Sequence, residues 1–185
     1  MENNGLTERI RIFNKIRDIP YAITPGLTRP EHARRALMTN KGFCYQKHFL
    51  LGELFLELGL SVLYEVSLFA WQEFSPLFPE HLKRLAQNLP PDFHLSCLVE
   101  INNEFILVDA TLDSPLQKLG LRVNRWDGLN NTPRSSTPLS PPTLYHPSES
   151  RLKENKPKAS KEALAFYKEL NAWLQTARTN QNPDP

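Results

Sequence analysis

The sequence predicts an α+β fold, in which a central helix packs on an antiparallel sheet. Two observations carry this prediction. Residues 49–58, a short way after Cys44, are apolar at most positions, and a helix that is apolar on most sides is normally enclosed within a domain. Further along, two apolar segments, 93–101 and 104–111, are separated only by Asn102-Asn103, which is typical of a β-hairpin. Helix and sheet together would form a two-layer domain.

Two helices are expected before the central one. Leu6, Ile10, Phe13 and Ile16 recur at helical spacing and predict the first of them. Thr28-Arg29-Pro30-Glu31 has the pattern of a capping box with proline in the first turn, and it predicts a second helix that continues to about Thr39.

The central helix carries a cysteine in its first turn and ends at Gly59, a typical C-terminal glycine cap. The free backbone N–H groups and the helix dipole at that turn favour a thiolate, and they can also bind the oxyanion of an attacked carbonyl. At roughly 100° per residue, Leu51, Phe55 and Leu58 fall within about 40° of Cys44, so the thiol should lie on the buried stripe. Cys44 is therefore either a nucleophile or a small core cysteine.

After the central helix, residues 61–70 are rich in Val, Leu, Tyr and Phe and predict a strand that joins the hairpin in a sheet of three or more strands. Residues 71–92 then form a long connection, with a short helix over 79–86. This connection leads into the strand that carries His94, so it is either a lid or substrate wall, or a surface helix that covers a sheet edge.

The hairpin register follows from its turn, because a two-residue loop pairs Ile101 with Glu104 and therefore Cys97 with Val108. One face of the hairpin is then nearly all apolar and belongs to the core. On the other face, His94 and Asp109 are diagonal neighbours, about 7 to 8 Å apart at Cα, which a hydrogen bond between imidazole and carboxylate can bridge.

Cys44, His94 and Asp109 therefore form a candidate Cys-His-Asp triad. An imidazole can take the thiol proton and later protonate the leaving group, while a carboxylate orients the ring and stabilises the imidazolium. One rival is His48, at i+4 from Cys44, as a base or ligand. Another is a zinc site formed by Cys44, His48, His94 and Cys97, whose ligand types suit zinc, although His94 and Cys97 would face opposite sides of a strand.

These residues resemble the core motif of the transglutaminase-like superfamily of cysteine enzymes. The resemblance rests on Gly42-x-Cys44, the helix through Gly59, His94 at a strand start and Val108-Asp109-Ala110-Thr111, and it covers about residues 18–113. It implies a transglutaminase-like or papain-like core, with Cys44 as nucleophile, His94 as base and Asp109 as the orienting carboxylate. It also implies acyl transfer or hydrolysis at an amide or peptide bond through a thioester.

Two branches of that superfamily share features with the chain. Gly42-Phe43-Cys44-Tyr45 and Asp18-Ile19-Pro20-Tyr21 are similar to arylamine N-acetyltransferases, whereas Asp109-Ala110-Thr111-Leu112-Asp113 is similar to transglutaminases and bacterial transglutaminase-like peptidases. Tyr21 and Tyr45 are candidates for oxyanion or substrate binding, and Tyr21 can equally be a packing tyrosine. No cofactor is expected, except acetyl-CoA for the acyltransferase alternative. A third alternative is a non-catalytic binding module that retains the fold.

The remainder of the chain predicts extensions to a catalytic core at residues 1–128. Within the core, 121–126 is a possible last strand. A Pro/Ser/Thr-rich linker or strap is expected over 129–158, then an amphipathic helix over 159–179, and a disordered tail at 180–185. The helix would begin after a Ser160 cap and would dock its apolar stripe on this domain or on a second copy, so a homo-oligomer is possible.

Composition narrows the range of partners. The 185 residues are 40% hydrophobic, enough for a substantial single core, and the net charge of +2 favours neither nucleic acid nor an acidic surface. No apolar stretch approaches the ~20 residues of a membrane span, and the N-terminus lacks the pattern of a signal peptide. Because the chain has two cysteines that we expect on different faces, we predict no disulfide and a cytoplasmic location. The expected substrate is a protein, a peptide or a small amide.

Overall fold

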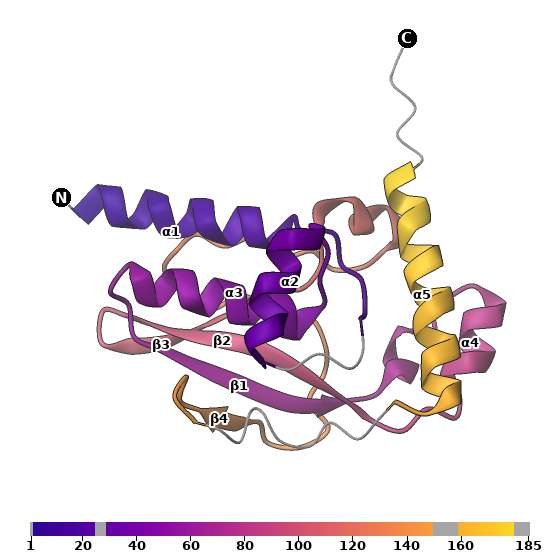
Figure 1. Ribbon diagram of the computed structural model, residues 1–185. Coiled ribbons are helices and arrows are strands. Elements are labelled where there is room, and N and C mark those ends of the chain that lie inside the picture. The colour runs from indigo at the N-terminus through magenta and orange to yellow at the C-terminus, as the bar shows by residue number, and fades with distance from the viewer. Residues whose placement is uncertain (1, 25–28, 150–158, 180–185) are drawn as a thin grey trace, which may run out of the picture.

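The computed structural model describes residues 2–24, 29–149 and 159–179, in which helices pack on a four-stranded antiparallel sheet (Figure 1). In chain order the elements are α1 (Glu2–Arg17), α2 (Arg29–Thr39), α3 (Cys44–Glu57), β1 (Val62–Phe69), the 3-10 helix η1 (Trp71–Phe74), α4 (Glu80–Ala86), β2 (Asp92–Ile101), β3 (Glu104–Val108), the 3-10 helix η2 (Ser114–Leu119), β4 (Thr143–Tyr145) and α5 (Lys161–Thr179). The predicted α+β fold class is confirmed. The proposed cap at Thr28 lies outside the described residues.

The sheet has the strand order β3-β2-β1-β4, and the hairpin of β2 and β3 has the predicted register, with Cys97 opposite Val108. Both turn residues are left-handed, with φ of 53° at Asn102 and 66° at Asn103, as a tight hairpin turn requires. β3 ends at Val108 rather than at residue 111. As a result, the part of β2 before Cys97 pairs with β1 alone, and the N-terminus of α3 lies near this open edge.

Helix α3 lies on one face of the sheet, with α1 and α2 beside it (Figure 1). At Gly52 of α3 an added Cβ would stand 2.5 Å from the hydroxyl oxygen of Tyr64 in β1, so a side chain there would require the helix or the tyrosine to shift. Leu51 and Phe55 are fully buried, as the helical stripe predicts. The stripe was expected to include Leu58, but this residue is 41% exposed, because α3 ends at Glu57 and Leu58 is the C-cap.

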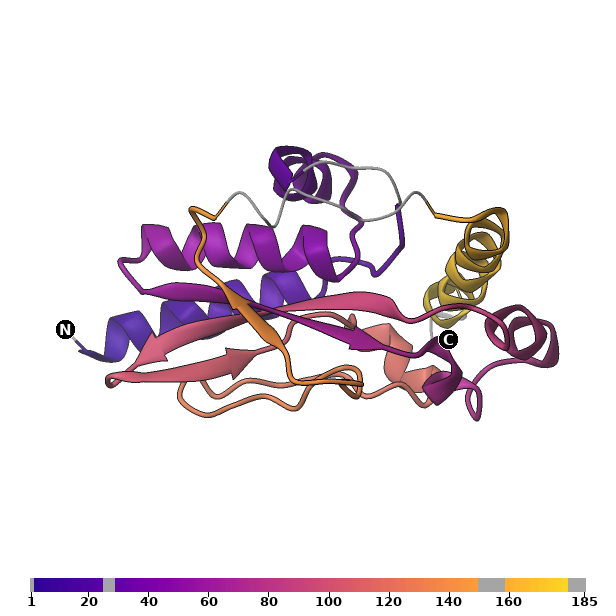
Figure 2. The same cartoon turned by 90° about the horizontal axis from the view of Figure 1, so that it is seen from below.

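Residues 131–139, which we call the strap, run from the outer edge of β3 to β1, and Figure 2 shows this loop along the sheet. Its backbone bonds to two strands, since Thr132 N–H donates to the Leu107 carbonyl and Leu139 N–H to the Leu68 carbonyl, each at 2.8 Å. Between these points Arg134 forms a bidentate ion pair with the buried Glu65. The chain then forms β4, which adds to β1. Residues 150–158 lie outside the described residues, and the linker or strap over 129–158 stays a prediction. The division of the chain at residue 128 stays a prediction.

Residues 121–126, proposed as a last strand, form no strand. Side chains hold this segment instead of a backbone ladder. The Asn124 amide donates to the carbonyls of Asp109 and Pro133 at 2.9 and 2.7 Å. Trp126 is buried, with its ring centroid 5.7 Å from that of Phe13. The segment is therefore held against the end of the hairpin and the strap by side-chain contacts.

Helix α5 packs against α4 and η2 of its own chain (Figure 1). Ser160 caps it, because its Oγ accepts a hydrogen bond from Ala163 N–H at 3.1 Å. The buried face includes Phe166, Leu170 and Leu174, whereas Leu164 of the same helix is 45% exposed. This face is covered within the chain, and a homo-oligomer stays a prediction. The tail at 180–185 lies outside the described residues. Among the helices that the structure describes, none is long and apolar enough to cross a membrane.

Candidate active site

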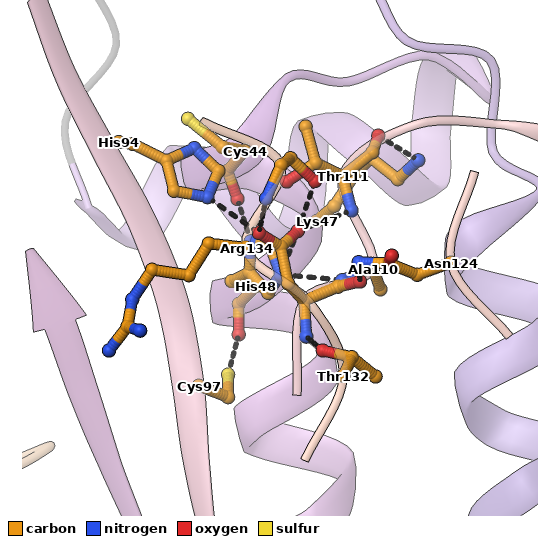
Figure 3. A network of polar contacts seen from close by, with 12 residues as sticks. Cys44, Lys47, His48, His94, Cys97, Ala110, Thr111, Asn124, Thr132 and Arg134 are labelled. Carbon is orange, nitrogen blue, oxygen red and sulfur yellow. Dashed lines mark hydrogen bonds and ion pairs between the residues drawn. The ribbon is translucent and has the colours of Figure 1, made fainter. Parts of the chain in front are cut away.

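Cys44 is the first residue of α3 and lies beside the imidazole of His94 (Figure 3). The helix begins there because Phe43 has extended backbone angles and its N–H donates to the Gln46 side chain at 3.1 Å. Cys44 Sγ lies 4.0 Å from the Phe93 carbonyl oxygen. The residue is only 4% exposed, so the thiol is almost closed off from solvent.

His94 connects the thiol to a carboxylate. Its Nε2 lies 2.9 Å from Oδ2 of Asp109, and the ring lies beside the Cys44 side chain (Figure 3). Burial lowers the pKa of His94, but the negative charge and hydrogen bond of Asp109 outweigh it and, with Cys44, raise the pKa to about 10. The ring is therefore an imidazolium at neutral pH, able to stabilise a thiolate and to protonate a leaving amine.

Asp109, just after β3, is completely buried and saturated with hydrogen bonds. Besides His94, its carboxylate accepts bonds from Thr111 N–H at 3.1 Å and from both the N–H and the hydroxyl of Ser135 at 2.8 Å. Burial raises the pKa of Asp109, yet His94 and these donors together hold it well below its usual range. The strap thus stabilises the carboxylate in the ionised state.

His48, one turn after Cys44, is buried between the helix and the segment that follows Asp109. Its Nδ1 lies 2.9 Å from the Cys44 carbonyl oxygen, and its Nε2 accepts a hydrogen bond from Ala110 N–H at 2.9 Å. Because Nε2 must be an acceptor, the proton is on Nδ1 and the ring is neutral. Burial is the largest effect on the His48 ring and lowers its pKa to about 4, despite the nearby Asp109. His48 therefore positions the backbone of the site and is not its base.

This neutral His48 should make the fold sensitive to acid. Above pH 6.5 the folded and unfolded states both hold a neutral imidazole, so His48 does not change the free energy of unfolding with pH. As pH falls from 6.5 to about 4, only the unfolded chain takes up the proton, and the free energy of unfolding should drop by roughly 3 kcal/mol. We expect His48→Gln to flatten this slope in urea titrations, whereas His81→Gln, at an exposed position of α4, should retain it. Equal slopes in all three proteins would contradict the assignment.

Lys47 joins two segments behind the triad. Its Nζ donates to the carbonyls of Arg17, Ile19 and Thr111 at 2.7 to 2.9 Å, and the side chain is fully buried. Burial lowers the pKa of Lys47 to about 7, against the attraction of nearby carboxylates, first among them Asp113. The lysine thereby connects the segment that leads to Tyr21 with the segment that follows Asp109.

The two tyrosines proposed for oxyanion or substrate binding have different surroundings. Tyr21 forms a parallel bridge with Gly42, two residues before Cys44. Burial and then the charge of Cys44 raise the pKa of Tyr21 well above its usual value, so the phenol keeps its proton and can donate it in a hydrogen bond. The ring of Tyr45 instead lies in an aromatic cluster, with centroids 5.9 Å from His32 and 6.0 Å from Phe43.

Cys97 lies apart from this arrangement. Its thiol donates to the His48 carbonyl at 3.2 Å, toward α3 and away from the sheet face of His94, and burial raises its pKa well above the usual value. Both cysteines are free thiols. In the ranges described, no three His, Cys, Asp or Glu side chains gather as metal ligands, and the proposed zinc set of Cys44, His48, His94 and Cys97 does not converge.

Beside His94 lies a cavity of about 40 Å³. Its walls come from segments far apart in sequence: the long connection between β1 and β2, the segment after Asp109, the strap and α5. The lining residues are Tyr21, Phe69, Trp71, Phe74, Phe78, His94, Thr111, Leu112, Leu121, Ser135, Ser136, Leu170, Trp173 and Leu174. The connection over 71–92 thus contributes to a wall beside the candidate base.

Several of these residues were not predicted as parts of the site. The i+4 spacing placed His48 near Cys44, but only the neighbouring backbone reveals that it is a positioning residue. Ser135 and Thr132, whose Oγ1 accepts a hydrogen bond from Asp109 N–H at 2.8 Å, lie in a segment whose composition signals only extended chain. A basic residue such as Lys47 within an apolar run is the one local signal that could have been followed, since a buried lysine needs several acceptors.

Comparisons with known proteins add little to this geometry. No protein-family model matches the chain, and no curated protein does so. A solved structure to which the chain is similar is a "putative cysteine protease" from Cytophaga hutchinsonii, with 20% sequence identity and a TM-score of 0.41. The similarity covers 76% of this chain and 40% of that protein, so the chain spans less than half of its length. The functional proposal therefore rests on the site itself.

Proposed function

We propose that this chain is a thiol enzyme that hydrolyses or transfers an acyl group at an amide or peptide bond through a thioester on Cys44. The observation that carries the proposal is the placement of His94, whose Nε2 lies 2.9 Å from the Asp109 carboxylate while the ring lies beside the Cys44 side chain (Figure 3). Three groups in this order are what a nucleophile, a general base and an orienting carboxylate require.

In the proposed reaction, the Cys44 thiolate attacks the carbonyl carbon of the substrate. The imidazolium of His94 stays beside the thiolate during this attack. The carbonyl oxygen becomes negative and is stabilised by the backbone N–H groups of the first turn of α3, with the Tyr21 phenol as a further donor. The C–N bond then breaks as His94 protonates the leaving amine, and a thioester remains. Water or an amine next attacks the thioester, giving its proton to His94 and releasing the thiolate of Cys44.

The test is acylation of the thiol by a small electrophile, because the site is nearly closed. We expect p-nitrophenyl acetate to release one equivalent of p-nitrophenolate in a burst and to leave an acetyl group on Cys44, found by peptide mass mapping. Cys97 is the internal control, since it is fully buried and its thiol is protonated. Iodoacetamide should likewise modify Cys44 before Cys97.

Two variants complete this experiment. Cys44→Ala should abolish the burst with the fold retained, and Cys97→Ala should keep it. Modification of Cys97 in preference to Cys44, or a folded parent that forms no acyl adduct, would contradict the proposal and favour the core cysteine of a binding module. Turnover with water or with an added arylamine then decides between hydrolysis and the acetyltransferase-like reaction.

A further inference from the structure

We propose that Ser135 and Arg134 of the strap are positioning residues of the triad, which set the reactivity of Cys44 through the Asp109 carboxylate. The inference rests on the proposed function and deepens it, because it adds two residues outside the triad on which the rate depends. Its basis is a continuous series of contacts, from a buried glutamate of β1 to the carboxylate of the triad.

Ser135 contacts both oxygens of the Asp109 carboxylate. Its N–H donates to Oδ2 and its hydroxyl to Oδ1, each at 2.8 Å. Oδ2 also lies 2.9 Å from His94 Nε2, whereas Oδ1 accepts a longer hydrogen bond, at 3.1 Å, from Thr111 N–H. Rotation of a carboxylate about its own bond is only weakly restricted, and two donors from one residue fix it. The Ser135 hydroxyl therefore keeps Oδ2 directed at the imidazole.

Arg134 attaches the strap to the sheet face that carries His94. Its guanidinium donates twice to Glu65 at 2.8 Å, and the Glu65 side chain is 7% exposed. Glu65 lies opposite Ser96 of β2, which shares a face of that strand with His94, two residues earlier. A bidentate pair of this kind fixes geometry as well as charge. Because Arg134 directly precedes Ser135, the pair also anchors the N–H that Asp109 accepts.

The two ends of the strap are anchored independently of these side chains. At one end, Thr132 N–H donates to the Leu107 carbonyl at 2.8 Å, and at the other end Leu139 N–H donates to the Leu68 carbonyl at 2.8 Å. Both are backbone hydrogen bonds, which a change of side chain does not remove. Substitutions in the middle of the strap should therefore move the carboxylate of the triad without unfolding the chain.

The first experiment removes the Ser135 hydroxyl. We expect Ser135→Ala to slow the acylation of Cys44 by p-nitrophenyl acetate about tenfold, near the lower end of the effect of a hydrogen bond to a charged group. Ser135→Thr, which retains a hydroxyl, should recover most of the rate. The control is Thr137→Val, at an exposed position of the same strap whose contact with Glu73 is made by the backbone N–H. It should keep the parent's rate.

A spectroscopic readout separates positioning from a general loss of stability. The His94 Nε2 proton, which lies between the ring and a buried carboxylate, should give a resolved low-field NMR signal in the parent and in Thr137→Val. In Ser135→Ala the carboxylate turns more freely, so we expect this signal to broaden. A merely structural role would lower the urea midpoint and leave the signal unchanged.

The second experiment removes the ion pair as a unit, with Glu65→Gln and Arg134→Gln together, so that no buried charge is left unpaired. Acylation should slow, but by less than in Ser135→Ala, because the hydroxyl remains. Adding Ser135→Ala should then give a rate within about twofold of Ser135→Ala alone, since groups that act through one contact are not additive. Arg125→Gln, which changes an exposed arginine, is the control and should keep the parent's rate.

The outcomes distinguish this inference from the proposed function. Equal rates and equal NMR signals in Ser135→Ala and Thr137→Val overturn the role of Ser135 while the thiol chemistry stands. An ion-pair effect that is absent, or that multiplies with that of Ser135, overturns the role of Arg134. Failure of the folded parent to form any acyl adduct on Cys44 overturns the proposed function itself.

Discussion

Replacing Asp109 with Asn should slow the reaction of Cys44 by ~10- to 10⁴-fold, the upper end being the loss seen when the acid of a triad becomes an amide. Asp109 acts on the thiol only through His94, whose Nε2 it contacts at 2.9 Å. Without the carboxylate charge, the pKa of His94 should fall from about 10 toward or below its usual value, because burial is then opposed mainly by Cys44. The measurements are acylation rates across pH and NMR titration of the ring.

A double-variant cycle separates this role from simple loss of structure. His94→Ala should hide most of the effect of Asp109→Asn, since residues that act as one unit are not additive. Circular dichroism should confirm that the hairpin stays folded, because Ser135 and Thr111 can still donate to the amide oxygen. Additive effects, or an Asp109→Asn variant with the parent's pH profile and ring titration, would show that Asp109 does not act on Cys44 through His94.

Arg178→Ala should lower the free energy of unfolding by about 3 kcal/mol, as expected when one partner of a buried ion pair is removed. The Arg178 guanidinium forms a bidentate pair with Asp113, at 2.8 and 2.7 Å, and the two side chains are 12% and 1% exposed. It also donates to the Tyr21 carbonyl at 3.1 Å, while Asp113 accepts from Tyr21 N–H at 2.7 Å. The end of α5 thereby holds the backbone of Tyr21, so Cys44 acylation should slow as well.

The matched control is Arg11→Ala, which removes an exposed arginine that pairs with Glu8 on the surface of α1. Such pairs contribute little, so its urea midpoint should stay close to the parent's. Combining Arg178→Met with Asp113→Asn should recover part of the lost stability, because the buried charge is then gone and Asn can still accept from Tyr21 N–H. A single variant as stable as the control would show that α5 docks by apolar contacts alone.

The sequence by itself determined the fold class and most of the elements, because these follow from local patterns. The apolar run after Cys44 and the glycine that follows it define α3, and a two-residue asparagine turn leaves one register that keeps the apolar face of the hairpin together. That register also placed His94 and Asp109 on one face within reach of each other. The catalytic roles of these residues remain proposals, since only reactivity can test them.

Local patterns were insufficient where side chains, rather than a backbone ladder, hold the chain. Residues 121–126 have strand-like composition, yet Asn124 bonds to two distant carbonyls and the segment pairs with no strand. The Pro/Ser/Thr-rich segment signalled only an extended chain, and nothing in its composition reveals that Ser135 donates twice to Asp109. Contacts between residues 26 positions apart depend on how the layers assemble, which no local period records.

Only the tertiary structure decided the surroundings of the site. It joined the long connection after β1, the strap and α5 around one cavity beside His94. It also assigned His48 to a neutral, positioning role by placing its Nε2 against Ala110 N–H. The physical reason is that burial and hydrogen-bond satisfaction are properties of the packed chain: the same histidine or serine is a surface residue or part of a site according to what covers it.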